Sequence, residues 1–137
     1  MHTSAIIVAA GSSQRMGFDK LAAPLAGVPV LRRTLEVFLS ADLITDIIVV
    51  CPPERWVLLE DGIPGGFPKP VRRVDGGVTR PDSVAKGLAA LTPAARFVAV
   101  HDGARPLVSP EDITRCVVAA RESVSYTHLT LPTKRIV

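Results

Sequence analysis

Three glycine-containing segments with charged or hydroxyl side chains each follow a run of apolar residues. They are AAGSSQRMGFDK at residues 9–20, DGGVTRPDSV at residues 75–84 and HDGARP at residues 101–106. Backbone N–H groups in such loops can bind phosphate oxygens, and nearby cations neutralise the phosphate charge. Transfer of a nucleotidyl group requires this positioning and charge neutralisation but no protein nucleophile. The three segments together therefore indicate nucleotidyl-transfer chemistry.

The first segment is a turn of small residues followed by two cations. Arg15 can hold phosphate oxygens through two hydrogen bonds, whereas Lys20 acts as a point charge. The segment contains neither the GxxxxGK pattern of a P-loop nor the GxGxxG pattern of dinucleotide-binding proteins. The alternative is that both cations are ordinary solvated side chains. The residues predicted to approach a polyphosphate through their backbone are Ala9, Ala10, Gly11, Ser12 and Ser13.

The second segment combines two glycines with a cation and a hydroxyl group. Gly76 and Gly77 permit the backbone to approach a ligand closely. Arg80 adds a positive charge, and Ser83 lies in the first turn of a predicted helix, where its hydroxyl can reach a base or a phosphate. We predict that these four residues bind a nucleotide. The alternative is an ordinary glycine turn with a helix cap.

The third segment places a carboxylate at the end of a strongly apolar run. Asp102 is well positioned to hold a divalent metal that bridges phosphates. Gly103 and Ala104 are small enough to leave room for a substrate, and Arg105 is expected to face an anion. The alternative is that Asp102 caps a helix or forms a salt bridge with Arg105.

Parallel strands would bring these segments together, because ligands of open α/β sheets bind at the carboxyl ends of the strands. The runs that predict strands are residues 5–10, 46–51, 71–74 and 96–101. The apolar spacing predicts helices at residues 29–41, 82–91 and 109–120, and one short helix within residues 52–70. This alternation predicts right-handed crossovers and a mainly parallel sheet covered by helices on both faces.

Helix-start signals support these boundaries. Pro29 stands at a helix-start position, and Asp82 is a candidate N-cap for the helix that follows the second segment. Ser109, followed by proline and glutamate, predicts the start of the last helix.

Composition indicates one soluble domain. The chain has 137 residues, of which 47% are hydrophobic and 21% charged, and this is enough for a single core but too little for two. The formal net charge of +3 falls to +1 when Lys134 and Arg135 near the C-terminus are left out. With only 4% aromatic residues, the chain has neither the charge nor the stacking surface expected of a nucleic-acid-binding protein.

Cysteine usage and hydropathy predict a cytoplasmic protein. Cys51 and Cys116 are far apart and form no metal-binding motif, so we expect buried free thiols in a reducing compartment. The apolar run at residues 5–10 lacks a cationic lead-in and is too short for a signal sequence. No stretch approaches the roughly 20 apolar residues of a membrane span, and we expect no membrane association.

The last residues, 124–137, depart from the preceding pattern. The string VSYTHLTLPT resembles the read-through translation of a transposase-type sequencing adapter. We therefore expect residues 1–123 to be part of a nucleotidyltransferase domain and residues 124–137 to be a non-native tail. The alternative is a genuine edge strand.

The motifs AAGSSQRMGFDK, GGVTRPDSV and VHDGARP, in this order and spacing, closely resemble the N-terminal half of the 2-C-methyl-D-erythritol 4-phosphate cytidylyltransferase family. The first motif is shared with other nucleotidyltransferases, including molybdenum-cofactor ones, whereas the second and third together are more specific. The resemblance covers about residues 4–120. It implies an α/β, Rossmann-like, three-layer nucleotidyltransferase fold with a mainly parallel sheet. Family members continue for nearly as long again, so it also implies a truncated fold.

The resemblance implies an enzyme of the non-mevalonate isoprenoid pathway that transfers CMP from CTP to methylerythritol phosphate and releases pyrophosphate. Arg15 and Lys20 match the family's catalytic cations, and Asp102 matches its Mg²⁺-binding aspartate. Arg105 falls on the side of the sugar phosphate. Gly103, which stands where relatives commonly have alanine, falls within the nucleotide site. The positions matching the family's cytidine contacts are Ala9, Ala10, Gly11, Gly77 and Ser83.

The family's second half supplies further acceptor contacts and the arm that builds its homodimer. We therefore expect this chain to retain part of a CTP site and to have little or no transferase activity. Two alternatives stay open: a nucleotidyltransferase for another acceptor, such as a polyol phosphate or the molybdenum cofactor, and a non-catalytic nucleotide-binding module. The presence of both Arg15 and Lys20 argues against the second alternative, since a binding module does not need to stabilise a transition state.

Overall fold

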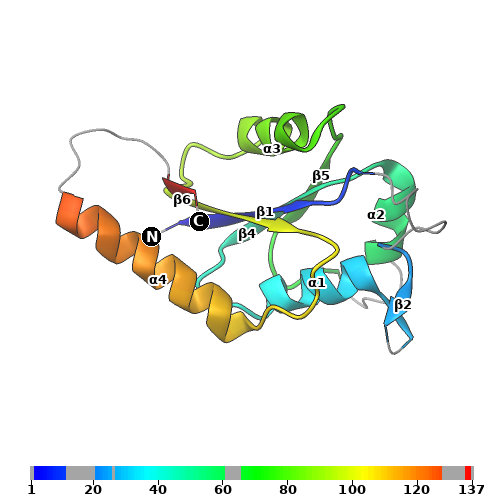
Figure 1. The fold of residues 1–137 in the computed structure, drawn as a ribbon, viewed down its shortest axis with the longest axis horizontal. Coiled ribbons are helices and arrows are strands. Elements are labelled where there is room, and N and C mark those ends of the chain that lie inside the picture. Colours follow the sequence, from blue (N-terminus) through cyan, green and yellow to red (C-terminus); the bar gives the residue numbers. More distant parts are fainter. Residues whose placement is uncertain (1, 12–20, 26, 61–65, 128–134, 137) are drawn as a thin grey trace.

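The main sheet of the protein is parallel. The computed structural model describes residues 2–11, 21–25, 27–60, 66–127 and 135–136. Within these residues the sheet has five strands in the order β5-β4-β1-β6-β7, each pair parallel (Figure 1). The strands are β1 Thr3–Val8, β4 Asp46–Val50, β5 Val71–Val74, β6 Phe97–Asp102 and β7 Arg135–Ile136. The predicted parallel α/β fold is confirmed.

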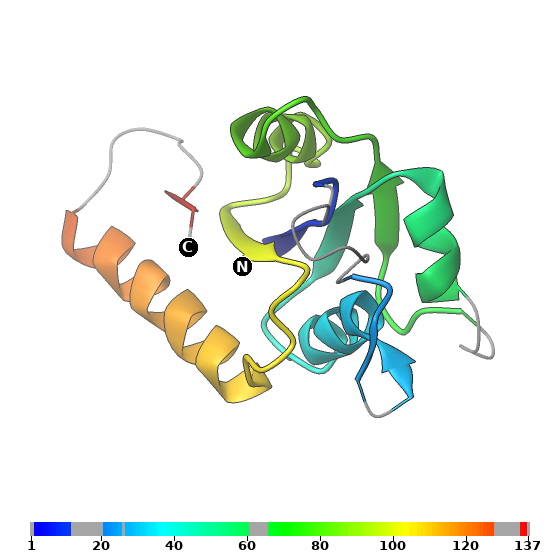
Figure 2. The same cartoon turned by 45° about the vertical axis from the view of Figure 1, so that its right-hand side comes forward.

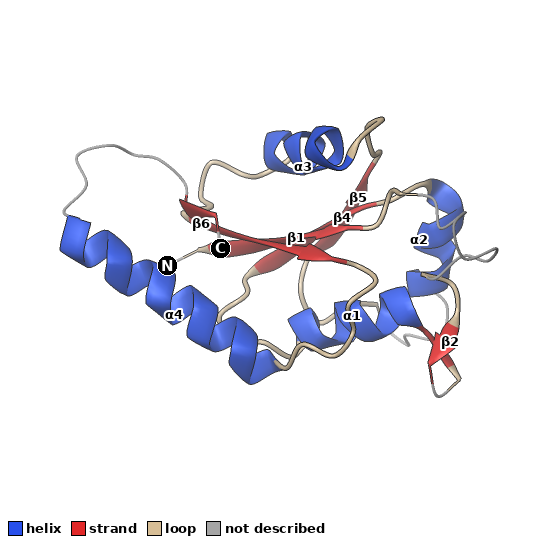
Figure 3. Ribbon diagram, in the orientation of Figure 1, coloured by secondary structure: helices blue, strands red, loops and turns tan. Residues whose placement is uncertain are grey.

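Helices cover both faces of the sheet, as predicted. Helix α3 (Arg80–Ala89) lies on one face, and α1 (Val30–Leu39) and α4 (Pro110–Thr127) lie on the other. Figure 2 shows from a second direction that α3 lies on the opposite side of the sheet from α1 and α4. Figure 3 shows the loops that join strands to helices. The short α2 (Pro53–Glu60) contacts α1.

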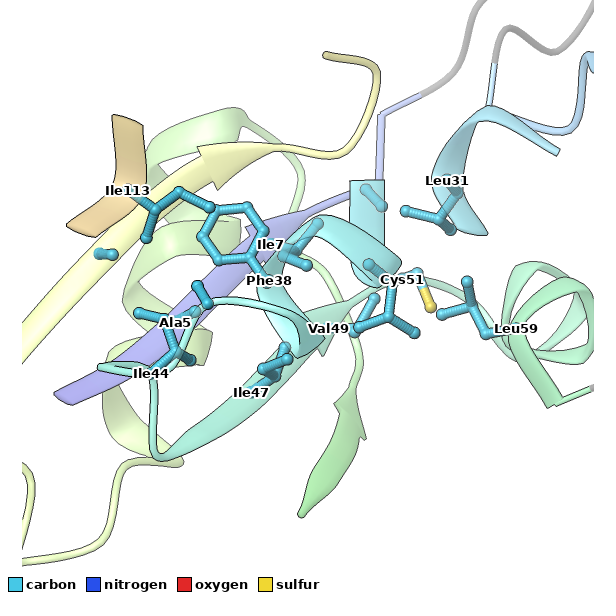
Figure 4. Close-up of a cluster of buried hydrophobic side chains, with 14 of the residues drawn as sticks. Ala5, Ile7, Leu31, Phe38, Ile44, Ile47, Val49, Cys51, Leu59 and Ile113 are labelled. Atoms are coloured by element: carbon cyan, nitrogen blue, oxygen red, sulfur yellow. The ribbon is translucent and has the colours of Figure 1, made fainter. Parts of the chain in front are cut away.

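The alternation of side chains along β1 explains the two layers of core. Ile7 packs with Phe38 and Val49 on the side of α1 and α4 (Figure 4). Ile6 packs with Val98 and neighbouring residues on the opposite side, toward α3. A strand buried on both faces reads as a continuous apolar run, and this is why the strands are evident in the sequence.

A small antiparallel hairpin precedes α1 and was not predicted. It consists of β2 (Pro24–Leu25) and β3 (Val28–Pro29), and Gly27 has φ +82° in the turn between them. This left-handed conformation favours glycine because a Cβ would crowd the backbone. The hairpin leads the chain from the first loop into α1.

The predicted N-cap of α3 is wrong by three residues. Thr79 is the N-cap: its Oγ1 accepts a hydrogen bond from the Asp82 backbone N–H (3.2 Å), and the Asp82 carboxylate accepts one from the Thr79 N–H (3.2 Å). Asp82 is therefore the third residue of the helix in a capping box. At α4 the prediction is confirmed, since Ser109 and Asp112 form the same reciprocal pair.

Two further predictions concern the two cysteines and the boundary at residue 123. Cys51 is buried, but Cys116 is exposed on α4, so the prediction of two buried thiols is wrong for Cys116; both thiols are free. Helix α4 runs to Thr127, past the predicted boundary at residue 123, and β7 pairs with β6. Within the described ranges, no helix has the length and apolar character needed to cross a membrane.

Candidate functional site

A cavity of about 220 Å³ opens at the carboxyl edge of the sheet. Its position follows from the strand register, because Val8 of β1 pairs with Val50 of β4 and with Asp102 of β6. The loops after β1 and β6 therefore start side by side. All three predicted segments contribute to the wall of the cavity, which includes Ala9, Gly11, Gly77, Arg80, Ser83 and Asp102.

The first loop is fixed by two hydrogen bonds at Ala9. The Ala9 N–H donates to the Val50 carbonyl (2.8 Å), so the loop continues the ladder of the sheet. The Ala9 carbonyl accepts a hydrogen bond from Arg55 Nη1 (2.6 Å). Arg55 lies on α2 and is only 9% exposed. A buried guanidinium thus places positive charge directly behind the turn that is predicted to meet a polyphosphate.

The second loop depends on glycine for its close packing. A Cβ on Gly76 would lie 2.2 Å from the Cβ of Ala10, so the first and second loops touch where neither has a larger side chain. The buried Ser83 accepts a hydrogen bond from the Gly77 N–H (3.0 Å). The Ser83 hydroxyl therefore orders the loop as an acceptor, and its own O–H can still act as a donor.

The third loop begins with the predicted metal-binding residue. Asp102 lines the cavity, and its Oδ1 accepts a hydrogen bond from the Ala104 N–H (3.0 Å). Gly103 is buried, and a Cβ there would lie 2.8 Å from Leu31 Cδ1 of α1. The loop therefore sits directly on α1, and a Cβ at Gly103 would require the Leu31 side chain to shift.

Arg105 does not join the cavity wall. Its side chain is exposed, and its N–H donates to the Asp102 carbonyl (3.2 Å). Among the described residues there is no ion pair between Asp102 and Arg105, so the alternative of a salt bridge finds no support. Ala10, Gly76 and Gly103 likewise do not line the cavity and act as close-packed spacers between loops. Ser12, Ser13, Arg15 and Lys20 lie outside the described residues.

Arg73 and Asp75 lie outside the cavity wall and form an ion pair with each other. Arg73 Nη1 donates to Asp75 (2.6 Å), and this hydrogen bond lowers the pKa of Asp75. Arg73 also donates to the Cys51 carbonyl (2.9 Å) at the end of β4. Burial raises the pKa of Cys51 to about 11, so this thiol stays protonated and is not a nucleophile.

The cavity fits a metal carried by a nucleotide better than a metal held by protein alone. The described residues contain no group of three or more His, Cys, Asp or Glu side chains that could hold an ion. Mg²⁺ in phosphate-binding sites is typically held by one or two carboxylates together with substrate phosphates. Asp102 could serve as such a carboxylate, since it lines the cavity and the Ala104 N–H orients one of its oxygens.

Sequence reasoning missed Arg55 and Thr34, which support the loops of the site from two helices. Arg55 holds Ala9 across 46 positions, and Thr34 of α1 donates to the Gly103 carbonyl (2.7 Å) across 69 positions. Neither lies in a glycine-containing loop. A cation in the helix directly after the second strand was the only available signal for Arg55, and the sequence held none for Thr34.

A parallel sheet with helices on both faces and three glycine-containing loops around one cavity at its carboxyl edge is the arrangement of a nucleotidyltransferase fold. The model of the family "2-C-methyl-D-erythritol 4-phosphate cytidylyltransferase" matches residues 3–136. The chain belongs to this family.

Relatives and a solved structure agree with this assignment. The chain is 44% identical over 137 residues to 2-C-methyl-D-erythritol 4-phosphate cytidylyltransferase from Prochlorococcus marinus, covering 96% of this chain and 60% of that protein. It is 47% identical over 136 residues to the bifunctional enzyme IspD/IspF of Desulforudis audaxviator, covering 96% of this chain and 34% of that one. The crystal structure of 4-diphosphocytidyl-2C-methyl-D-erythritol synthase from Anaerococcus prevotii superposes with a TM-score of 0.75 at 34% identity, over 88% of this chain and 52% of that one.

The match covers most of this chain but only part of each relative. The chain spans about 60% of the length of the Prochlorococcus relative and a smaller share of the other two proteins. The family model also extends over the predicted tail, to residue 136. The division at residue 123 remains a prediction.

Proposed function

We propose that this chain carries the CTP-binding part of an enzyme that transfers CMP from CTP to 2-C-methyl-D-erythritol 4-phosphate. The observation that carries the proposal is the convergence of three loops on one cavity, where Asp102, Ser83 and the backbone of Gly77 meet. The cavity is lined partly by small residues, so a ligand can approach the backbone closely. Family membership supports the same reaction.

In the proposed reaction a phosphate oxygen of the acceptor attacks the α-phosphorus of CTP. The bond between that phosphorus and the bridging oxygen to the β-phosphorus breaks, and pyrophosphate leaves with the electron pair. Negative charge develops on the α-phosphoryl oxygens, so fixed cations lower the barrier. We propose Arg15 and Lys20 for this role, and the buried charge of Arg55 supports the turn that precedes them.

We propose Asp102 as the residue that holds Mg²⁺ with the CTP phosphates. A bound cation neutralises phosphate charge and orients the leaving pyrophosphate. Arg105 is proposed to contact the acceptor phosphate, because it matches the sugar-phosphate side of the family's site and its side chain is exposed outside the cavity wall. A homodimer and a cytoplasmic location are proposed from the resemblance to the family, and we expect nucleic acid not to bind.

Calorimetric titration of the 137-residue chain tests the nucleotide assignment. With Mg²⁺ present we expect CTP to bind in preference to ATP and GTP, because we propose that backbone groups of the three closely packed loops recognise the shape of the base. Equal affinity for all three nucleotides, or no binding, would contradict the proposal.

Pyrophosphate release tests the reaction. With CTP, Mg²⁺ and methylerythritol phosphate we expect little turnover by this chain, because it spans about 60% of the Prochlorococcus relative's length. Substantial turnover would overturn the expectation of low activity. Competition with polyol phosphates would then distinguish the proposed acceptor from the alternatives.

A further inference from the structure

The Gly103–Ala104 peptide unit connects a buried hydroxyl on α1 with the carboxylate in the cavity. Thr34 Oγ1 donates to the Gly103 carbonyl at 2.7 Å. On the other side of the same peptide, the Ala104 N–H donates to Asp102 Oδ1 at 3.0 Å. Because a peptide unit is planar and trans, its C=O and N–H point in opposite directions. The direction of one hydrogen bond therefore fixes the direction of the other.

The surroundings of the Thr34 hydroxyl favour its hydrogen bond to the Gly103 carbonyl. Thr34 is fully buried. It has one proton and two acceptors within reach, the Gly103 carbonyl at 2.7 Å and the Val30 carbonyl of its own helix at 3.2 Å. The shorter contact is the better hydrogen bond. Donation to Val30 alone would leave the carbonyl of the buried Gly103 without this donor, and an unsatisfied buried carbonyl is unfavourable.

Packing holds the peptide unit in the same place. The Gly103 N–H donates to the Val8 carbonyl at 2.9 Å, which extends the sheet by one residue past the end of β6. A Cβ on Gly103 would meet Leu31 at 2.8 Å and Ala9 at 3.1 Å. The loop is thus held between the sheet and α1, and the Thr34 hydrogen bond adds to these contacts at the Gly103–Ala104 peptide.

We propose that Thr34 is a positioning residue that orients the Asp102 carboxylate for a nucleotide-bound divalent cation through the Gly103–Ala104 peptide. This role rests on the proposed function of the cavity. Groups that orient a metal ligand typically change metal affinity about 10- to 100-fold when removed. Thr34 contacts neither the cavity nor, in this proposal, the substrate, and it acts only through the peptide.

Metal binding tests the role without requiring turnover. Mn²⁺ is titrated into the chain saturated with CTP, and free Mn²⁺ is measured by electron paramagnetic resonance. We expect Thr34→Val, which keeps the shape and removes the hydroxyl, to weaken Mn²⁺ binding about 10- to 100-fold. Thr34→Ser, which keeps the hydroxyl, is expected to restore most of the wild-type affinity. Calorimetry with CTP in the presence of a chelator is expected to give the same affinity for all three proteins.

Unchanged Mn²⁺ affinity in Thr34→Val would overturn the role. An equal loss of CTP affinity in the chelator would also overturn it, because Thr34 would then act on loop packing in general. Absence of Mn²⁺ binding in the wild-type chain would overturn the proposed function and this role together. If Thr34→Val does not fold, Thr34→Ser and Thr34→Ala form a second pair that differs only in the hydroxyl, and the same loss is expected in the alanine variant.

Discussion

The two edges of the main sheet carry similar polar side chains in different settings. At the amino edge, Ser4 and Asp46 face each other in the register of β1 and β4 and are almost fully buried. Ser4 Oγ donates to Asp46 Oδ1, and His2 Nε2 lies 3.0 Å from the same oxygen. At the carboxyl edge, Asp102 borders a cavity of about 220 Å³ and is oriented by a backbone N–H.

This difference shows that an aspartate at a strand end does not by itself indicate a functional site. Asp46 has two side-chain partners inside the protein, so its hydrogen bonds stabilise the fold. Asp102 has a backbone partner on one oxygen and a cavity beside it, so we propose that its remaining hydrogen-bonding capacity is used by a ligand. The partners of the carboxylate, rather than its position on a strand, separate the two roles.

The largest expected effect on stability comes from Asp46→Ala. It removes the acceptor of two hydrogen bonds at a buried site, and breaking a buried, charge-assisted network costs about 3 kcal/mol. Urea denaturation should show this loss, while the folded fraction binds CTP with unchanged affinity. A loss of CTP affinity equal to that of an Asp102 variant would contradict the division of roles between the edges.

The complementary change, Asp102→Asn, is expected to affect binding instead of stability. It keeps the side-chain shape and an acceptor for the Ala104 N–H but removes the negative charge that would hold a cation. Mg²⁺-dependent enhancement of CTP binding should fall by about 100-fold or more, since a ligand is lost rather than its support. Calorimetry with and without Mg²⁺ measures this, and thermal unfolding serves as the control.

Gly76→Ala tests whether the close contact between the first and second loops shapes the cavity. Its Cβ would lie 2.2 Å from the Cβ of Ala10, and overpacking of this kind costs about 1–3 kcal/mol. We expect lower stability and weaker CTP binding together. Gly11→Ala is the matched control for stability only, because its new Cβ meets nothing within 4 Å but Gly11 itself lines the cavity.

A second variant makes the Gly76 test sharper. Combining Gly76→Ala with Ala10→Gly removes the carbon atom that causes the clash, so both stability and CTP binding should recover in part. Equal defects in the single and double variants would show that the contact with Ala10 does not limit the loop.

The sheet could be predicted from sequence because its central strands are buried on both faces. The run at 46–51 exceeds the fully buried β4 by one residue, and the run at residues 71–74 matches β5 in full although this edge strand is only partly buried. The first strand was placed two residues late, since Thr3 and Ser4 are polar although fully buried. Their burial depends on hydrogen bonds to distant residues, and a local apolar pattern does not contain that information.

The candidate site could be predicted only in its loops. Ala9, Gly77 and Asp102 were found because glycine-containing loops after strands must meet at one edge of a parallel sheet. Arg55 and Thr34 were missed because each acts through a carbonyl that is far away in the sequence. Whether an arginine or threonine in a helix supports such a loop depends on tertiary packing.

Alkylation of the two cysteines tests the packing of the fold, and we expect it to leave the candidate site unchanged. Cys116 was predicted to be buried, but it lies on the exposed side of α4. Iodoacetamide at pH 8 should label Cys116 in the folded protein and Cys51 only after unfolding in guanidinium. The reason is that Cys51 is fully buried and its pKa is raised to about 11. Mass spectrometry distinguishes the two sites, and native labelling of Cys51 would contradict the packing of β4 against the core.

The raised pKa of Cys51 also predicts how stability responds to alkali. In the unfolded chain the thiol ionises near the ordinary value of 9.0, whereas in the folded protein burial raises the pKa to about 11. Between these values the unfolded state binds fewer protons, so stability falls as the pH rises through this range. Cys51→Ala removes the titrating group, so its melting temperature should fall less steeply between pH 8.5 and about pH 10.5. Identical slopes would show that another group controls the alkaline response.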